Sequence, residues 1–368
     1  MRGLYVHVPF CAKKCSYCDF YSVPAQKEFI DPYIKAVMLE CRAYRGLSFD
    51  TLYIGGGTPS LLGAKNLGKL IDGLHQAFDL SELVEATIEV NPESATARLL
   101  ETAKASGINR ISVGVQSLSE QELERIGRVH TAARAVEVVG RAKKLGFRTV
   151  SADLMIGLPG QKWEGLRASL ETLISLGIDH FSLYCLSLEQ GTPLALNLPA
   201  DLPSDDMQAD LFERASLFLD RHGFVHYEIS NFALEGHECL HNLNYWRGGE
   251  YLGLGPAAAS HLGGRRFKNR ADLDAYFEDP AHLVEDVEEL KIKDKAAEEA
   301  MLRLRLIAEG LDPNDLIERF GHENVNDLVG RLKEMAKVRD LSFDGSSYRL
   351  APSRILTSNQ IFIRVLFD

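Results

Sequence analysis

The sequence predicts an α/β fold: an incomplete (β/α)6 barrel followed by a small winged-helix-like α+β domain. Two observations predict the barrel: six short apolar runs recur in the first half of the chain, and segments of helical period separate them. Repeated strand–helix units form parallel sheets with right-handed crossovers. The second domain is predicted by two helical patterns followed by two strand-like runs around a Gly-Ser-Ser turn. A doubly wound open sheet is the alternative to the barrel.

The six predicted strands are apolar or alternating runs, as expected for strands buried in a parallel sheet. Most of the helical segments between them end in a glycine that suits a helix C-cap. The strands lie at residues 4–8, 51–56, 86–91, 110–116, 149–157 and 180–186, and the helices at 31–46, 64–78, 94–107, 131–146 and 164–177. A complete eightfold barrel would need two further units before residue 200, and the sequence shows none.

The remaining elements divide the chain into three predicted parts. Residues 1–235 form the barrel and end in a Pro-rich break at 196–207, a helix at 208–223 and a strand at 225–233. Residues 236–285 are rich in glycine, aromatic and polar residues, which predicts ordered loops over a site. Residues 286–368 form the C-terminal domain, with a charged linker and helix start at 284–301, helices at 296–310 and 325–338, and a hairpin at 341–351.

The composition excludes several classes of protein. The 368 residues carry 41 Lys and Arg against 52 Asp and Glu, a formal net charge of −11. Broad nucleic-acid binding needs a basic surface, so we expect no nucleic-acid partner, and a packing or partner-docking role for the C-terminal domain. The N-terminus lacks the signature of a signal peptide, and no apolar run approaches the roughly 20 residues that span a bilayer. We therefore expect a cytoplasmic protein without a transmembrane segment.

Three of the six cysteines are spaced as metal ligands. Cys11, Cys15 and Cys18 form a C-x3-C-x2-C cluster just after the first predicted strand, while the other three are scattered. The carboxyl ends of barrel strands carry the chemistry of such folds. Three thiolates can bind three irons of a [4Fe–4S] cluster and leave the fourth iron open to a small ligand. The alternative is a zinc site completed by His7 or Asp19, although zinc sites usually pair their ligands at short spacings.

This spacing, with the aromatic Tyr17 before the last cysteine, resembles the radical S-adenosylmethionine (SAM) superfamily, whose fold is a partial (β/α)6 barrel. The resemblance implies that SAM chelates the open iron through its amino and carboxylate groups. It also implies a reductant as a partner, because one-electron reduction cleaves SAM to a 5′-deoxyadenosyl radical. The sequence leaves open whether SAM is cleaved in this protein.

Glycine and polar residues at successive strand ends are the expected SAM contacts. A lone GGGTP segment or strand-end carboxylate would be an ordinary turn or polar group, but several that converge on one barrel mouth predict a ligand site. Arg128 suits the SAM carboxylate in fork geometry. Glu89, Gln116 and Asp153 are expected to end the third, fourth and fifth strands. By resemblance to the superfamily branch that contains oxygen-independent coproporphyrinogen III oxidase, the SAM site is expected at Tyr5, Gly56, Gly57, Thr58, Glu89, Gln116, Arg128 and Asp153.

Within that branch, the oxidases carry a further cysteine where this chain has Phe20, and a long N-terminal extension where it has only ten residues before Cys11. In both features the chain instead resembles the HemW family of haem chaperones. The H-N-x-x-Y-W motif at residues 241–246 also resembles that family. An imidazole and two aromatic faces suit a porphyrin. We therefore expect His241, Tyr245 and Trp246 to bind haem. The sequence leaves open that His241 only bonds a loop, and that the iron ligand is instead Cys239, His7, His226, His237 or His261.

The resemblance implies a haem chaperone that binds a [4Fe–4S] cluster, SAM and haem, and passes haem to an unidentified acceptor protein. The sequence leaves open a membrane-bound acceptor. The alternative function is enzymatic: oxygen-independent oxidative decarboxylation of the propionates of coproporphyrinogen III. A third hypothesis is a cluster-bearing regulatory protein whose C-terminal domain binds a partner.

Overall fold

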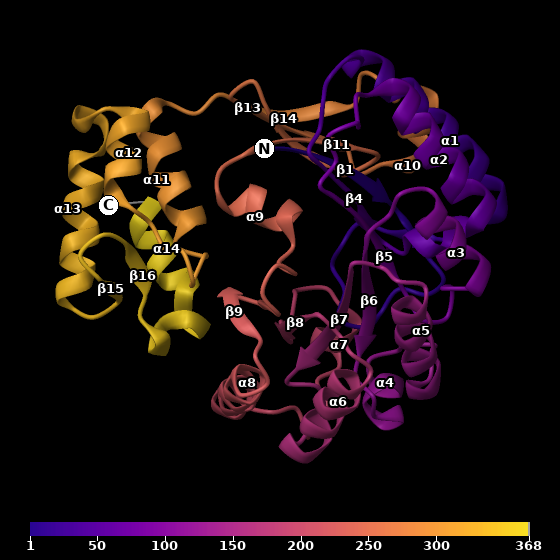
Figure 1. Cartoon of the computed structure of the whole chain (residues 1–368), viewed down its shortest axis with the longest axis horizontal. Coiled ribbons are helices and arrows are strands. Elements are labelled where there is room, and N and C mark those ends of the chain that lie inside the picture. The colour runs from indigo at the N-terminus through magenta and orange to yellow at the C-terminus, as the bar shows by residue number, and fades with distance from the viewer. Residues whose placement is uncertain (367–368) are drawn as a thin grey trace.

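The computed structural model, which describes residues 1–366, is organised around one mixed sheet of twelve strands (Figure 1). Six strands at its centre are parallel and neighbour one another in chain order, as the sequence predicts. Every second residue of these strands, such as Ile111, Val113 and Val115, belongs to one buried apolar core, and polar residues such as Ser112 stand between them. The six are β1 (Arg2–Val8), β4 (Thr51–Gly56), β5 (Glu85–Val90), β6 (Arg110–Gln116), β7 (Thr149–Ile156) and β8 (His180–Cys185).

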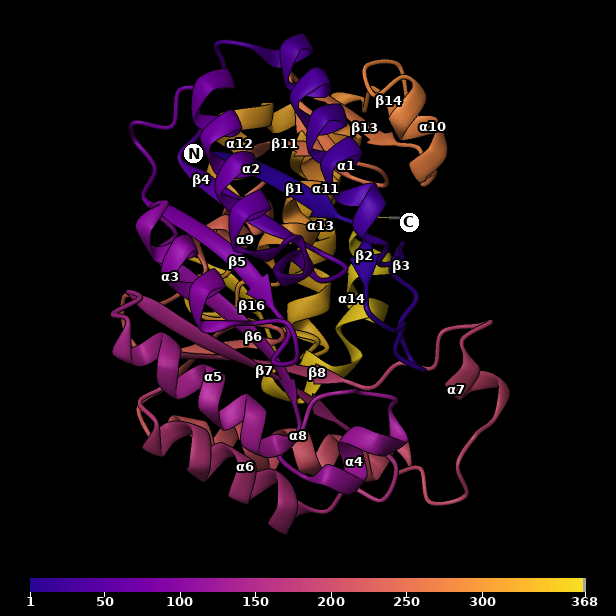
Figure 2. The ribbon, with the colours of Figure 1, turned by 90° about the vertical axis from the view of Figure 1, so that its right-hand side faces the viewer.

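Helices cover the outer face of this parallel core, and Figure 2 looks directly onto them. Each packs one apolar side on the sheet. Helix α2 (Gly63–Ala77) buries Leu67, Leu70, Ile71 and Leu74, whose spacing places all four on one helix face. The other helices of this layer are α1 (Lys27–Glu40), α3 (Ala97–Ala105), α4 (Glu120–Arg125), α5 (Ala132–Lys144) and α6 (Trp163–Ser175), with α8 (Asp205–Asp220) beside α6.

The sheet extends further at both edges than the sequence predicts. Strand β11 (Glu250–Leu254) lies parallel to β1. Three antiparallel strands follow it: β12 (Ala259–Leu262), β13 (Arg265–Asn269) and β14 (Val284–Glu288). Beyond β8, a hairpin of β10 (Asn231–Ala233) and β9 (Val225–Glu228) replaces the single strand expected at 225–233.

Residues 236–285 are therefore not the loops that the sequence suggested. They contain helix α9 (Leu240–Trp246), strands β11 to β13 and helix α10 (Leu273–Glu278). The expectation was wrong because these strands are short and polar: β13 reads RRFKN, and only Asn269 of it is buried. The pairing partner, rather than the local sequence, defines such strands. The expected linker within 284–301 likewise contains β14, although a helix does begin there, α11 (Ile292–Arg303).

The C-terminal domain has its own hydrophobic core and lies across α9 from the sheet (Figure 1). The expected pattern of helices followed by a hairpin is confirmed: α11 and α13 (His322–Lys337) precede β15 (Leu341–Phe343) and β16 (Tyr348–Leu350). Two further helices, α12 (Pro313–Phe320) and α14 (Ser358–Leu366), were not predicted. Among residues 1–366, no helix is long and apolar enough to cross a membrane.

Candidate cofactor and haem site

A cavity of about 1210 Å³ opens at the carboxyl ends of the six central strands. Its walls come from the cysteine-bearing loop, the strand ends, α9, the β12–β13 hairpin, and α11 and α12 of the C-terminal domain. Pockets for one drug-sized ligand typically measure about 300–1,000 Å³. The cavity therefore has room for more than one small molecule.

The three clustered cysteines line this cavity as half-buried free thiols. The Thr58 hydroxyl donates to Cys11 Sγ at 3.7 Å, and Arg128 Nη1 donates to Cys15 Sγ at 3.5 Å. Burial, reinforced by the two neighbouring thiols, raises the pKa of Cys18. Three sulfur donors on one loop, with a guanidinium to balance thiolate charge, fit an iron–sulfur cluster with one open iron.

The zinc alternative gains no support from His7. One ring nitrogen of His7 lies 3.0 Å from the Tyr5 hydroxyl, and the other lies 3.1 Å from the Tyr21 carbonyl. Both nitrogens are thus engaged by protein groups. Within the described part of the chain, no three His, Cys, Asp or Glu side chains are grouped closely enough to hold a single metal ion.

The residues expected to bind SAM all line the same cavity. Glu89 accepts hydrogen bonds from the Tyr53 hydroxyl at 2.7 Å and from the Gly56 amide at 3.1 Å, and burial raises its pKa to about 7. Gln116 ends β6 with a φ of 63°, which is uncommon for a residue other than glycine and is typical of functional sites. The full set is Tyr5, Gly56, Gly57, Thr58, Glu89, Gln116, Arg128 and Asp153.

Asp153 differs from its expected position, since it lies in the middle of β7 rather than at its end. Its carboxylate accepts a hydrogen bond from the Ser112 hydroxyl at 3.0 Å, and burial raises its pKa. Ser112 is on the neighbouring strand β6. Asp153 therefore belongs to the inner wall of the cavity, below the strand ends.

Arg128 is held rigidly between the cysteine loop and the sheet. Besides Cys15, its Nη2 donates to Asn91 Oδ1 and to the Gly114 carbonyl, both at 2.8 Å. Asn91 in turn donates to Thr58 Oγ1 at 3.0 Å. Sequence reasoning missed Asn91, although its place directly after β5 was the available signal.

The H-N-x-x-Y-W residues form α9, which is anchored at the opposite ends of the strands. The Glu85 carboxylate at the start of β5 accepts hydrogen bonds from the backbone amides of Leu240 at 2.9 Å and His241 at 3.1 Å. Tyr245 and Trp246, at the other end of α9, line the cavity. The motif thus runs along the inside of the sheet toward the site.

His241 itself does not line the cavity. It is buried, its Nδ1 lies 2.8 Å from Thr51 Oγ1, and its Nε2 lies 2.7 Å from the Tyr245 hydroxyl. Its ring stacks on Tyr53 at 5.2 Å between centroids. In this arrangement the imidazole has no free nitrogen for iron, and it positions Tyr245 instead.

Comparison with known proteins agrees with this architecture. Residues 5–173 match the model of the radical SAM superfamily. The coproporphyrinogen III oxidase HemN of Escherichia coli, a radical SAM enzyme, has the same fold, with a TM-score of 0.87 and 22% identity over 99% of this chain and 89% of that one. The fold and the cysteine site together define a radical SAM protein.

The relatives narrow this class. The chain is 34% identical to the "Heme chaperone HemW" of Lactococcus lactis over 100% of this chain and 98% of the relative. It is 40% identical to the HemW of Escherichia coli over 70% of this chain and 69% of the relative. The protein belongs to the HemW family of the radical SAM superfamily. A mitochondrial radical SAM domain-containing protein 1 of Danio rerio is 38% identical over 70% of this chain and 59% of its own length.

Proposed function

We propose that this protein is a cytoplasmic haem chaperone that binds a [4Fe–4S] cluster, SAM and haem, and transfers the haem to an acceptor protein. One observation carries the proposal: a single cavity joins the three thiols, the expected SAM residues and the tyrosine and tryptophan of the H-N-x-x-Y-W helix. Membership in a family whose relatives are named heme chaperones supports the same function.

In this proposal, Cys11, Cys15 and Cys18 would hold the cluster, and the cluster would supply one-electron chemistry to SAM bound at its open iron. The guanidinium of Arg128, which Asn91 keeps in place, would pair with the SAM carboxylate. Gly57 lets the second strand approach the cysteine loop, because a Cβ there would lie 2.7 Å from the Phe10 carbonyl.

The haem would occupy the part of the cavity between the barrel and the C-terminal domain. Tyr245 lines this part from α9, and Leu302 and Phe320 line it from the C-terminal domain. Aromatic and aliphatic walls suit a porphyrin macrocycle. Because the walls belong to two domains, separating them would release the haem to an acceptor.

The test is an anaerobic haem titration of the cluster-reconstituted protein, followed in the Soret band, with a parallel assay for conversion of coproporphyrinogen III. We expect saturation near one haem per chain and no decarboxylated product. Absence of specific haem binding would refute the chaperone. Formation of decarboxylated product together with 5′-deoxyadenosine would establish the oxidase alternative.

A further inference from the structure

The β12–β13 hairpin presents one chemically distinctive face to the cavity. Across the strands, Tyr251 of β11 is opposite His261 of β12, which is opposite Arg266 of β13. Two residues along the hairpin, Ala259 is opposite Lys268. Side chains two apart on a strand share a face, and all five residues line the cavity. This face therefore combines an aromatic ring, an imidazole and two cations.

His261 has the surroundings of a metal-binding histidine. It is half-buried in the cavity wall, and its Nδ1 lies 3.3 Å from the Gly249 carbonyl. Histidines that bind metals usually donate one ring N–H to a carbonyl or carboxylate, which leaves the other nitrogen for the metal. Within residues 1–366, Nε2 of His261 has no hydrogen-bond partner. His241, with both nitrogens engaged, lacks this property.

An aromatic row connects His261 to the H-N-x-x-Y-W helix. The rings of Tyr245 and Tyr251 meet edge to face at 4.4 Å between centroids, and those of Tyr251 and His261 lie 6.2 Å apart. Since Tyr245 and Tyr251 line the cavity beside His261, a flat ligand coordinated by His261 would lie against their rings.

Four lysines line the cavity, and in the described chain none of them is ion-paired: Lys13 and Lys14 on the cysteine loop, and Lys268 and Lys295 beside the hairpin. Arg266 is paired with Glu298 of α11, but Lys268 and Lys295 have no carboxylate partner in the described chain. Lys295 is half-buried, and its Nζ reaches the turn of the hairpin, 3.1 Å from where a Cβ on Gly264 would lie. Lys268 is exposed at the mouth of the hairpin face, and two ammonium groups without counterions favour an anionic ligand.

We infer that the β12–β13 hairpin, rather than His241, seats the haem: His261 binds the iron, and Lys268 and Lys295 bind the propionate carboxylates. This inference rests on the proposed haem-binding function. Lys268 lies on β13 of the sheet and Lys295 lies on α11 of the C-terminal domain. Two propionates bound to these lysines would therefore connect the two domains around the haem.

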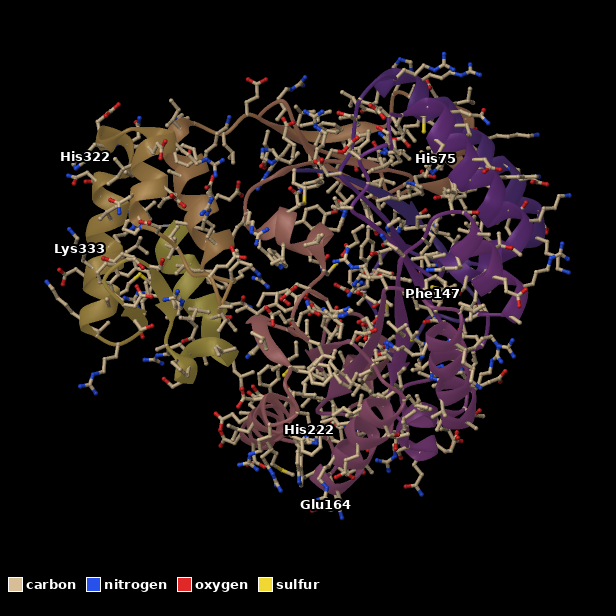
Figure 3. All side chains as sticks on the ribbon, viewed as in Figure 1. His75, Phe147, Glu164, His222, His322 and Lys333 are labelled. Carbon is tan, nitrogen blue, oxygen red and sulfur yellow. The ribbon has the colours of Figure 1, made fainter. Side chains whose placement is uncertain are left out.

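The iron ligand is tested by anaerobic haem titrations of the wild type, His261→Ala, His241→Ala and the control His75→Ala, whose side chain is exposed on α2 and outside the cavity (Figure 3). We expect His261→Ala alone to shift the Soret band, and added imidazole to restore it. Retention of the wild-type band by His261→Ala, or its loss only in His241→Ala, would overturn the assignment.

The carboxylate contacts are tested with two ligands, haem and its dimethyl ester, against Lys268→Ala, Lys295→Ala and the control Lys333→Ala on the outer side of α13 (Figure 3). Each cavity variant should bind haem about tenfold more weakly, as expected for loss of one charge-assisted contact. Affinity for the ester should not change. An equal loss for haem and ester, or no loss for haem, would overturn the lysine assignment.

Different results would contradict the proposed function and the inference about the hairpin. If the wild type binds no haem, the proposed function is wrong and the hairpin has no haem to seat. If the wild type binds haem with full affinity but His261, Lys268 and Lys295 can be replaced without effect, the function stands and the inference about the hairpin is wrong.

Discussion

At the scale of single residues, the site depends on polar side chains that are at least half-buried and make several hydrogen bonds within the protein. Arg128 is the central example, because it contacts Cys15, Asn91 and the Gly114 carbonyl at once. A buried charge without such partners would be strongly destabilising. The same contacts that satisfy the guanidinium also fix it beside the cysteine loop, where an anionic group of SAM would bind.

The first prediction concerns the cluster ligands. Cys15→Ser should abolish the brown chromophore of the reconstituted protein and leave a folded chain, because a serine hydroxyl is a poor ligand for iron in a sulfide cluster. Iron and sulfide content and visible absorption measure the effect. Cys41→Ala, a buried thiol outside the cavity, is the matched control and should retain the cluster. A full cluster in the Cys15 variant would remove it from the ligand set.

The second prediction concerns Arg128. Arg128→Ala should weaken SAM binding by about tenfold or more, since it removes a charge-assisted, fork-shaped contact. Calorimetric titration of the reconstituted protein with SAM measures the change. Arg167→Ala, an exposed arginine on α6 paired only with Glu171, should leave the affinity unchanged. Unchanged SAM affinity in Arg128→Ala would show that this residue serves only the cysteine loop.

The cavity residues that could be brought together from the sequence are those that lie on regular strands. Glu89 and Gln116 could be placed because each closes an apolar strand, and parallel strands bring their carboxyl ends together. His261 could not be selected among several histidines, because its position depends on a hairpin that the sequence does not reveal. The burial of His241 likewise depends on Thr51 and Tyr53, about 190 positions earlier in the chain.

At the scale of elements, α9 is held by a carboxylate at its first turn. Glu85 accepts hydrogen bonds from two backbone amides of α9 and also lies near the buried Arg110. A carboxylate at a helix N-terminus satisfies unpaired N–H groups and complements the helix dipole. This contact fixes the first turn of α9, and so the position of the H-N-x-x-Y-W residues, against the sheet.

The third prediction follows from that contact. Glu85→Ala should lower the free energy of unfolding by about 3 kcal/mol, because it removes the acceptor of two α9 amides and a negative charge near the buried Arg110. Denaturant unfolding measures the loss. Glu82→Ala, an exposed carboxylate three residues earlier, should change stability by less than about 0.5 kcal/mol. Similar small effects for both variants would mean that α9 is held by its apolar contacts instead.

The fourth prediction concerns Glu40, which joins α1 to the added strands. Burial raises its pKa from 4.5 to about 7, although Tyr276, Asn269 and the Gly255 amide donate hydrogen bonds to it. Below pH 4.5 the carboxyl is protonated in both the folded and the unfolded state. Between pH 4.5 and about 7 the unfolded chain ionises while the folded carboxyl keeps its proton, so up to about 3 kcal/mol of stability is lost as the pH rises through this range.

The Glu40→Gln variant has no carboxyl group at this position, so its stability should lack this pH-dependent loss. Denaturant unfolding of both proteins at pH 5 and pH 8 should show the wild type losing more stability than the variant on going to pH 8. Equal losses would contradict the raised pKa and mean that the three hydrogen bonds outweigh the effect of burial.

The elements that the sequence predicted and those it missed differ in physical character. The central strands carry a buried apolar residue at every second position, so their sequences alone predict strands. Strands β12 and β13 form an edge extension with charged residues such as Arg265 and Lys268, and they exist because β11 pairs with β1. Whether a segment of this kind forms an edge strand depends on the strand it pairs with in the tertiary structure.

At the scale of the whole molecule, the C-terminal domain forms part of the cavity wall and is attached to the barrel through α9. Arg247, just after α9, is ion-paired with Glu309. The guanidinium of Arg305 lies 4.5 Å from the Trp246 ring centroid and 5.2 Å from that of Phe362. One face of Trp246 is therefore covered by the C-terminal domain, so the last residue of the H-N-x-x-Y-W motif joins the domains as well as lining the cavity.

The fifth prediction tests whether this attachment retains the cargo. Arg305→Ala removes the cation over Trp246 and the positive charge near the buried Glu228, so the C-terminal domain should separate from α9 more often. The dissociation rate of haem should rise by about three- to tenfold, while the Soret band and SAM affinity stay unchanged, because no ligand contact is removed. Transfer to an excess of apomyoglobin measures the rate, with Lys337→Ala on α13 as the control. An unchanged rate would mean that haem leaves through the cavity mouth without domain separation, whereas a shifted Soret band would mean that Arg305 contacts the haem.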